Sequence, residues 1–141
     1  MTIRVSAYAV IVDGRGRLLL PHWSEGDRSG WTMPGGGLEL GEHPEDAMVR
    51  EVLEETGYHV VVGELLGIDS LVIPAEQRLA PGVGRFQALR VVFRARVVGG
   101  ALTAEQQGTT DSVAWFSPDE IDALDRVNLV DAARRMAGLI G

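Results

Sequence analysis

The sequence contains no cysteine. This absence excludes disulfide bonds, metal sites built from thiolates and a cysteine nucleophile, and it favours a cytosolic redox environment only weakly. There is also no apolar run of the ~18–20 residues that a membrane-spanning helix needs. The apolar stretch from Val5 to Val12 lacks the basic start and small-residue cleavage site of a signal peptide. We therefore interpret it as a buried strand and expect a cytoplasmic protein.

Positive charge is scarce as well. The 13 Lys and Arg residues stand against 20 Asp and Glu residues, for a formal net charge of −7. Binding to nucleic-acid polymers or anionic membranes depends on basic patches, so we expect neither as a partner. Small phosphorylated substrates remain compatible with this charge, because a bound metal ion changes it locally. The sequence leaves open whether the chain forms a homodimer.

The chain of 141 residues has the length of one domain, and no repeat, linker or low-complexity segment divides it. We therefore predict a single domain over residues 1–141. Ile3–Val12 and Leu18–Leu20 flank a turn at residues 13–16, which predicts a β-hairpin. Residues 22–37 contain six glycines or prolines and predict a long loop.

A helix is predicted from Pro44 to Thr56, because Pro44 suits the first turn and Gly57 suits the residue after the last. Ser117 begins a capping-box pattern at a second helix start, and Asn128 is the expected cap of a last helix that ends near Ala137. Strands are predicted at residues 58–73, 85–98 and 112–116, with a loop at residues 74–84. This order of elements indicates the α+β class.

Three glutamates crowd the end of the helix at residues 44–56. Glu51, Glu54 and Glu55 fall within roughly 100° of one another on the helical wheel. Glu51 and Glu55 are four residues apart, and their like charges destabilise a helix by ~0.2–0.5 kcal/mol. Seven acidic residues lie between positions 39 and 55 against one arginine, Arg50, so we expect side-chain pairing not to neutralise them. A hard divalent cation, Mg²⁺ or Mn²⁺, prefers such oxygen ligands. The alternative is a solvated glutamate-rich surface.

The spacing of these residues resembles the Nudix box, G-x5-E-x7-R-E-U-x-E-E-x-G-U, in which U is a bulky apolar residue. The matching residues are Gly36, Glu42, Arg50, Glu51, Val52, Glu54, Glu55 and Gly57. Only Tyr58, at the last position, departs from the usual aliphatic residue. Residues 31–37, 113–116 and 118–120 also resemble segments of that family. The resemblance implies the Nudix fold, a mixed β-sheet sandwiched between α-helices.

The resemblance also implies roles for individual residues. Glu51, Glu54 and Glu55 would be metal ligands or would bind the metal's water molecules, and the Gly35 carbonyl would add a backbone oxygen. Glu54 or Glu55 could also position the attacking water. Glu42 and Arg50 would pair and orient the cluster.

Further candidates lie outside the box. Glu105 and Asp111 are candidates for an extra catalytic base, although two surface acids in a turn are an equally good interpretation. Tyr8, Trp23 and Phe86 are candidate stacking surfaces for a base or sugar. Candidate phosphate or carboxylate contacts are Arg28, Arg78 and Arg85.

The implied function is Mg²⁺-dependent hydrolysis of a phosphoanhydride bond in a nucleoside diphosphate linked to another group. Pro74 lies 16 residues past the last position of the box, which resembles the ADP-ribose-cleaving branch and places nucleotide sugars slightly above oxidised nucleoside triphosphates. One alternative is a non-catalytic nucleotide sensor on the same fold. Another is an isomerase or glycosidase on that scaffold, which the complete box disfavours.

Overall fold

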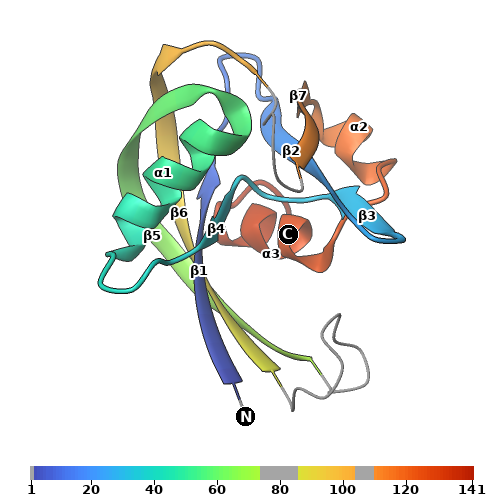
Figure 1. The fold of residues 1–141 in the computed structure, drawn as a ribbon. Helices are drawn as coiled ribbons and strands as arrows, with labels where there is room; N and C mark the ends of the chain where they lie inside the picture. Colours follow the sequence, from blue (N-terminus) through green and yellow to red (C-terminus); the bar gives the residue numbers. More distant parts are fainter. Residues whose placement is uncertain (1, 74–85, 104–109) are drawn as a thin grey trace.

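A computed structural model describes residues 2–73, 86–103 and 110–141, which form seven strands and three helices (Figure 1). The strands are β1 (Thr2–Val10), β2 (Leu18–Glu25), β3 (Arg28–Trp31), β4 (Gly35–Gly37), β5 (Tyr58–Ile73), β6 (Phe86–Gly100) and β7 (Thr110–Phe116). The helices are α1 (Pro44–Thr56), α2 (Pro118–Asp122) and α3 (Asn128–Met136). No helix in these ranges is long and apolar enough to cross a membrane.

The strands form two sheets. The larger has the order β4-β1-β6-β5, with β1 and β6 parallel and the other pairs antiparallel. The smaller has the order β3-β2-β7 and is antiparallel throughout. Helix α1 covers one face of the larger sheet and α3 lies on the other (Figure 1). The predicted α+β class is confirmed.

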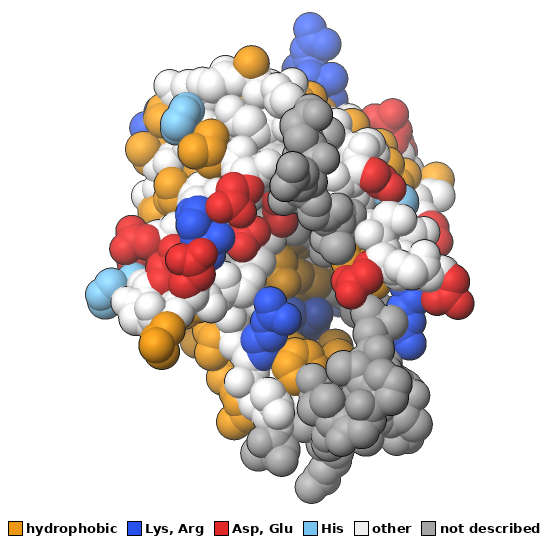
Figure 2. Space-filling model, viewed as in Figure 1, with side chains coloured by type: hydrophobic (Ala, Val, Ile, Leu, Met, Phe, Trp, Pro, Cys, Tyr) orange, Lys and Arg blue, Asp and Glu red, His pale blue; other side chains and the backbone are white. Residues whose placement is uncertain are grey.

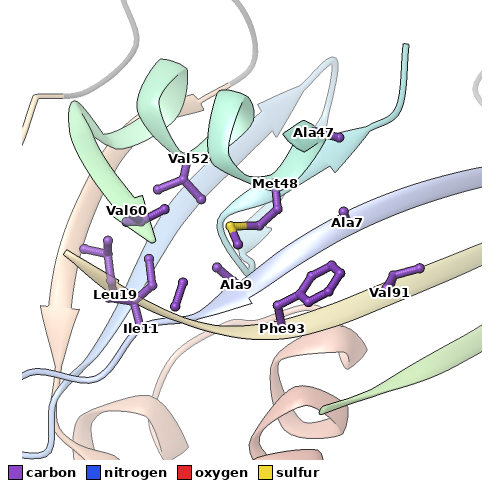
Figure 3. Packing of buried hydrophobic residues seen from close by; sticks show 11 residues of the cluster. Ala7, Ala9, Ile11, Leu19, Ala47, Met48, Val52, Val60, Val91 and Phe93 are labelled. Atoms are coloured by element: carbon purple, nitrogen blue, oxygen red, sulfur yellow. The ribbon is translucent and has the colours of Figure 1, made fainter. Parts of the chain in front are cut away.

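The alternation of side chains along β1 divides the core in two. Ala7 and Ala9 face α1, where they meet Met48 and Val52 in the first cluster (Figure 3). Val10 faces the opposite side and belongs to a second cluster, with residues of β2, α2 and α3. Because successive side chains of a strand point to opposite faces, one strand supports both clusters. The larger sheet is thus the middle layer of the molecule.

The predicted hairpin is wrong, although its turn forms. The Asp13 carboxylate accepts hydrogen bonds from the backbone N–H groups of Arg15 and Arg17, both at 2.9 Å. Beyond an isolated bridge between Val12 and Leu18, β1 and β2 part into different sheets. Strand β1 then pairs with β4 and β6, and β2 pairs with the following strand β3 and with β7. The partners β4, β6 and β7 are distant in the sequence, so adjacent segments do not reveal them.

The predicted loop over residues 22–37 is also wrong, because it holds the end of β2 and the whole of β3 and β4. The triple glycine pairs with β1 as strand β4, with Ser6 opposite Gly37 and Tyr8 opposite Gly35. Strand pairing uses backbone groups alone, so a glycine run that lies beside an open strand edge can join a sheet. The composition of this segment, rich in glycine and proline, pointed to a loop instead.

The helix boundaries agree better with the sequence. Helix α1 spans Pro44–Thr56 as predicted, and Gly57 follows it with φ 81°, donating its N–H to the Leu53 carbonyl. The capping box of α2 is present, since Ser117 and Glu120 exchange side-chain and backbone hydrogen bonds. The last helix differs by one residue. Asn128 is its first helical residue, and Val127 occupies the cap position without a side-chain hydrogen bond.

The remaining predicted strands form with shifted ends. Strand β5 has the predicted bounds, β6 extends two residues further than predicted, to Gly100, and β7 begins two residues earlier, at Thr110. The predicted loop at residues 74–84 lies outside the described residues, as does Pro74. The sequence therefore located these strands, while their order in the sheets came from the tertiary structure.

Candidate active site

A cleft of about 490 Å³ opens between α1 and β4 on one side and the smaller sheet on the other. Figure 2 shows a hollow with a group of acidic and basic side chains on one rim and hydrophobic and basic side chains on its floor. The floor is the face of the larger sheet that points away from α1. The cleft as a whole is lined by residues that include Arg4, Ser6, Tyr8, Trp23, Glu25, Met33, Gly35, Gly36, Gly37, Glu51, Glu55, Phe86, Ala88, Arg90, Thr110 and Leu129.

Arg50 is the centre of the acidic rim. Its Nε and Nη2 atoms each donate to one oxygen of the Glu42 carboxylate, both at 2.9 Å. Nη2 also donates to the Gly37 carbonyl at 3.1 Å, and Nη1 donates to Glu51 at 3.0 Å. The same guanidinium thus connects the loop before α1, strand β4 and the helix. The structure brings Glu42 and Arg50 together in the arrangement that the sequence suggested.

These hydrogen bonds change the acidity of both partners. The hydrogen bonds from Arg50 are the main cause that lowers the pKa of Glu42 from 4.5 to about 2, helped by the backbone N–H of Glu39. The hydrogen bond to Glu42 is likewise the main cause that raises the pKa of Arg50. Both groups are therefore charged at any physiological pH, and the pair is held by two parallel charge-assisted hydrogen bonds.

Arg50 reaches more carboxylates than the sequence suggested. Besides Glu42 and Glu51, its Nη1 atom lies 3.5 Å from Glu54 and 3.8 Å from Glu39. One cation that contacts four carboxylates leaves negative charge in excess. The expectation that side-chain pairing does not neutralise this cluster therefore agrees with the geometry.

The glycines of β4 let α1 approach the sheet closely. The Gly35 N–H donates to Glu55 at 2.9 Å. A Cβ atom on Gly36 would lie 2.7 Å from the carboxyl carbon of Glu51, so only glycine leaves room for that carboxylate. A Cβ atom on Gly35 would lie 2.1 Å from the Ala7 carbonyl oxygen, at a φ of 144°. The strand thus places two glutamates of α1 at the cleft.

The oxygen atoms on this rim have the chemistry of a magnesium or manganese site. Glu51 and Glu55 line the cleft beside backbone groups of β4, and hard divalent cations prefer carboxylate and carbonyl oxygens. Within the described ranges, no three acidic or histidine side chains converge as a metal site. Glu51 and Glu54 contact Arg50 instead, and Glu55 contacts Gly35. A cation bound here would compete with Arg50 for Glu51 and Glu54.

The three aromatic candidates all line the cleft. Tyr8 comes from β1, Trp23 from β2 and Phe86 from β6, so their rings surround it from both sheets. Burial is the main cause that raises the pKa of Tyr8. Its phenol therefore stays protonated at neutral pH and can donate a hydrogen bond.

Two other candidates within the described residues, Arg28 and Asp111, are not among the cleft residues. Arg28 begins β3 on the exposed side of the β2–β3 hairpin and is not among the cleft residues. Asp111 bonds to Nδ1 of His22 at 2.7 Å, while its neighbour Thr110 lines the cleft. Three predicted residues, Arg78, Arg85 and Glu105, lie outside the described residues.

Two arginines that line the cleft were not among the candidates predicted from the sequence. Arg4 on β1 and Arg90 on β6 lie on the same sheet face as Tyr8. Arg90 Nε donates to Asp69 of the adjacent β5 at 2.9 Å. Alternate residues of a strand point to the same face, so Arg4, four residues before Tyr8 on β1, shares its face. This signal was available in the sequence.

The chain is similar to known proteins over nearly its whole length. The NUDIX domain family model matches residues 2–136. A MutT-like protein of Streptomyces ambofaciens is 36% identical over 137 residues, which cover 97% of this chain and 77% of that protein. A human 8-oxo-dGDP phosphatase is 34% identical over 112 residues, which cover 75% of this chain and 31% of that protein. The solved structure of a NUDIX hydrolase from Nitrosomonas europaea has a TM-score of 0.81 and 29% identity, covering 98% of this chain and 90% of that one.

Proposed function

The chain belongs to the Nudix hydrolase family, and from this premise we propose that it hydrolyses a phosphoanhydride bond in a nucleoside diphosphate linked to another group, with Mg²⁺ as cofactor and Mn²⁺ as a substitute. One observation carries the proposal. The Arg50 network and the glycines of β4 hold Glu51 and Glu55 at the rim of a cleft large enough for a nucleotide.

We assign the metal to Glu51, Glu54, Glu55 and the carbonyl of Gly35. When bound, a divalent ion supplies positive charge for the phosphate oxygens and lowers the pKa of a nearby water molecule. The rim has more carboxylates than the single cation Arg50 can neutralise, which supports the assignment, because the remaining like charges repel one another unless a further cation binds.

The residues of the chain orient this chemistry. Arg50, anchored by Glu42, positions the Glu51 carboxylate, and the Gly35 N–H positions that of Glu55. In the reaction the oxygen of a water molecule bonds to phosphorus while the bridging P–O bond breaks, and the leaving phosphate takes the electron pair. We propose that Glu54 or Glu55 accepts the proton of that water.

For the nucleotide we favour an oxidised purine. The names of two relatives, a MutT-like protein and an 8-oxo-dGDP phosphatase, support this choice, as does a cleft with aromatic rings on two walls. ADP-ribose, which the sequence placed slightly higher, becomes the second candidate. The argument for ADP-ribose depended on the position of Pro74, which lies outside the described residues. Purified protein with Mg²⁺ should be assayed against 8-oxo-dGTP, 8-oxo-dGDP, ADP-ribose, other nucleotide sugars and dinucleoside polyphosphates.

The site assignment is tested by Glu54→Gln and Glu55→Gln. We expect each change to lower turnover by about 100-fold or more, since a carboxylate that positions water or takes its proton contributes about that much. Glu55→Gln also removes the like-charge pair with Glu51 and keeps an acceptor for Gly35, so stability should hold or rise by ~0.2–0.5 kcal/mol. Release of phosphate or phosphomonoester and urea unfolding measure the two effects.

Glu45→Gln is the matched control, because Glu45 is an exposed glutamate in the first turn of the same helix. It should leave turnover unchanged. Wild-type turnover in both Glu54→Gln and Glu55→Gln would remove these residues from the mechanism. Calorimetric binding of a nucleotide in Mg²⁺, with no product from any compound of the panel, would instead support a nucleotide sensor.

A further inference from the structure

We propose that Arg4 is a phosphate-binding residue that selects nucleotides with a free terminal phosphate over those whose outer phosphate is esterified to a sugar. This inference rests on the proposed function and assigns a substrate class to the same cleft. Arg4 belongs to β1, outside the Nudix box, and its guanidinium faces the cleft. Three features of Arg4 support the assignment: its side chain has no partner among the described residues, it lies near the glutamates, and a guanidinium binds phosphate.

Among the residues that the structure describes, Arg4 is a cation of the cleft whose side chain has no partner. Arg90, another arginine of the cleft, donates to Asp69, and on the rim Arg50 contacts several carboxylates. The guanidinium of Arg4 makes no hydrogen bond or ion pair with any residue in the described part of the chain. A cation that faces a cleft without a partner is available for an anionic ligand.

The position of Arg4 complements that of the glutamates. A Cβ atom added to Gly37 would lie 2.7 Å from Nη2 and 3.1 Å from Nε of Arg4. A Cβ atom added to Gly36 would lie 2.7 Å from the carboxyl carbon of Glu51. Neighbouring residues of a strand direct their side chains to opposite faces. The cation and the carboxylate therefore flank β4 from its two sides. A chain of phosphates that crosses β4 would have one group near Glu51 and another near Arg4.

The chemistry of the group favours a terminal phosphate. A terminal phosphate monoester carries about −1.5 to −2 charge at pH 7, because its second pKa is near 6. A phosphate esterified on its outer side carries only one negative charge. The planar guanidinium binds two phosphate oxygens at once, so it gains most from the group with more charge and more free oxygens.

The test compares Arg4→Gln and Arg4→Lys on two substrates, 8-oxo-dGTP and ADP-ribose, in Mg²⁺. We expect Arg4→Gln to lower kcat/KM for the triphosphate by about 10- to 100-fold, mainly through KM, because a charge-assisted contact is lost. The value for ADP-ribose should change little. Arg4→Lys should fall between, since an ammonium keeps the charge but loses the two-pronged contact.

Arg15→Gln is the control, because Arg15 is an exposed arginine in the turn that follows β1, beyond the end of the strand distant from Arg4. It makes the same change in net charge and should alter neither substrate. Equal losses on both substrates in Arg4→Gln, or no loss on either, would overturn the inference. Thermal melting of each variant checks that it is folded. We expect the Arg4 variants to fold, because Arg4 is exposed.

Binding of inorganic tripolyphosphate, measured by calorimetry in Mg²⁺, separates this inference from the proposed function. Arg4→Gln should weaken binding about tenfold or more, and Arg15→Gln should not. If the wild type hydrolyses no nucleotide while Arg4→Gln weakens binding, the proposed function fails and the phosphate site stands. If the wild type hydrolyses nucleotides and Arg4→Gln behaves as the wild type in both assays, only the phosphate site fails.

Discussion

At the scale of single residues, Arg50 explains how a cluster of like charges exists in a folded protein. Its guanidinium reaches carboxylates before and within α1, and it is fixed in turn by the Gly37 carbonyl. Glu42 takes two of its hydrogen bonds and is largely shielded from solvent, with a side chain 16% exposed. The pair therefore fixes the positions of the side chains on this rim.

The Glu42–Arg50 pair predicts a pH dependence of stability. The pKa of Glu42 is about 2 in the folded protein and near its ordinary 4.5 when unfolded. A group with a lowered pKa stabilises the folded state fully above pH 4.5 and loses this contribution as the pH falls toward 2. Glu42→Gln should therefore lose stability near neutral pH, and its stability should fall less steeply than that of the wild type between pH 4.5 and 2.

Urea unfolding of both proteins from pH 2 to 7 measures this difference. Glu45→Gln, which changes an exposed acid on α1, is the control and should follow the wild type in that acidic range. Parallel curves for the wild type and Glu42→Gln would show that Arg50 does not hold this carboxylate in its charged form.

At the scale of elements, β4 works as a spacer between β1 and α1. Its three glycines present hydrogen atoms where any other residue would meet a neighbour. The neighbours differ in kind. Gly35 approaches the backbone of β1, whereas Gly36 and Gly37 approach the ends of the Glu51 and Arg4 side chains. A backbone cannot yield, but the end of a flexible side chain can.

This difference predicts opposite outcomes for two alanine substitutions. Gly36→Ala should fold with stability close to the wild type and lose most of its turnover, because the new methyl group displaces the Glu51 carboxylate. Gly35→Ala should destabilise the protein by roughly 3 kcal/mol or more, since it adds a backbone clash to an unfavourable φ. Urea unfolding and phosphate release measure both effects. Full activity in a folded Gly36→Ala protein would contradict the proposed role of Glu51.

At the scale of the whole molecule, the larger sheet couples two cores. Trp115 packs against the cluster under α1, and Trp31 packs against the cluster that includes α3. Strand β1 contributes to both, through Ala9 on one face and Val10 on the other. Loss of packing in either cluster should therefore weaken the sheet that supports the other.

Met48→Ala tests this coupling. Met48 is fully buried, so its truncation should cost about 2–5 kcal/mol. Tryptophan fluorescence and far-UV circular dichroism should still report one coincident unfolding transition, shifted as a whole. Leu40→Ala, at a fully exposed position, is the control and should stay within about 0.5 kcal/mol of the wild type. Two separated transitions would show that the cores unfold independently.

The sequence by itself determined the features that depend on local spacing. The bounds of α1 follow from Pro44 and Gly57, and the shared face of Glu51, Glu54 and Glu55 follows from the helical repeat. The capping box at Ser117 and the strand at residues 58–73 follow in the same way. These features need no partner far along the chain, because bond geometry and the repeat of the element alone place the residues.

Only the tertiary structure decided which distant segments meet. It separated β1 from β2, made a strand of the triple glycine and brought Arg4 to the same cleft as Glu51. The backbone hydrogen bonds that pair strands are the same for nearly every residue type, so the sequence carries little information about strand partners. The glutamates could therefore be identified from their spacing, whereas the glycine spacer and the arginine opposite them depended on how the sheets assemble.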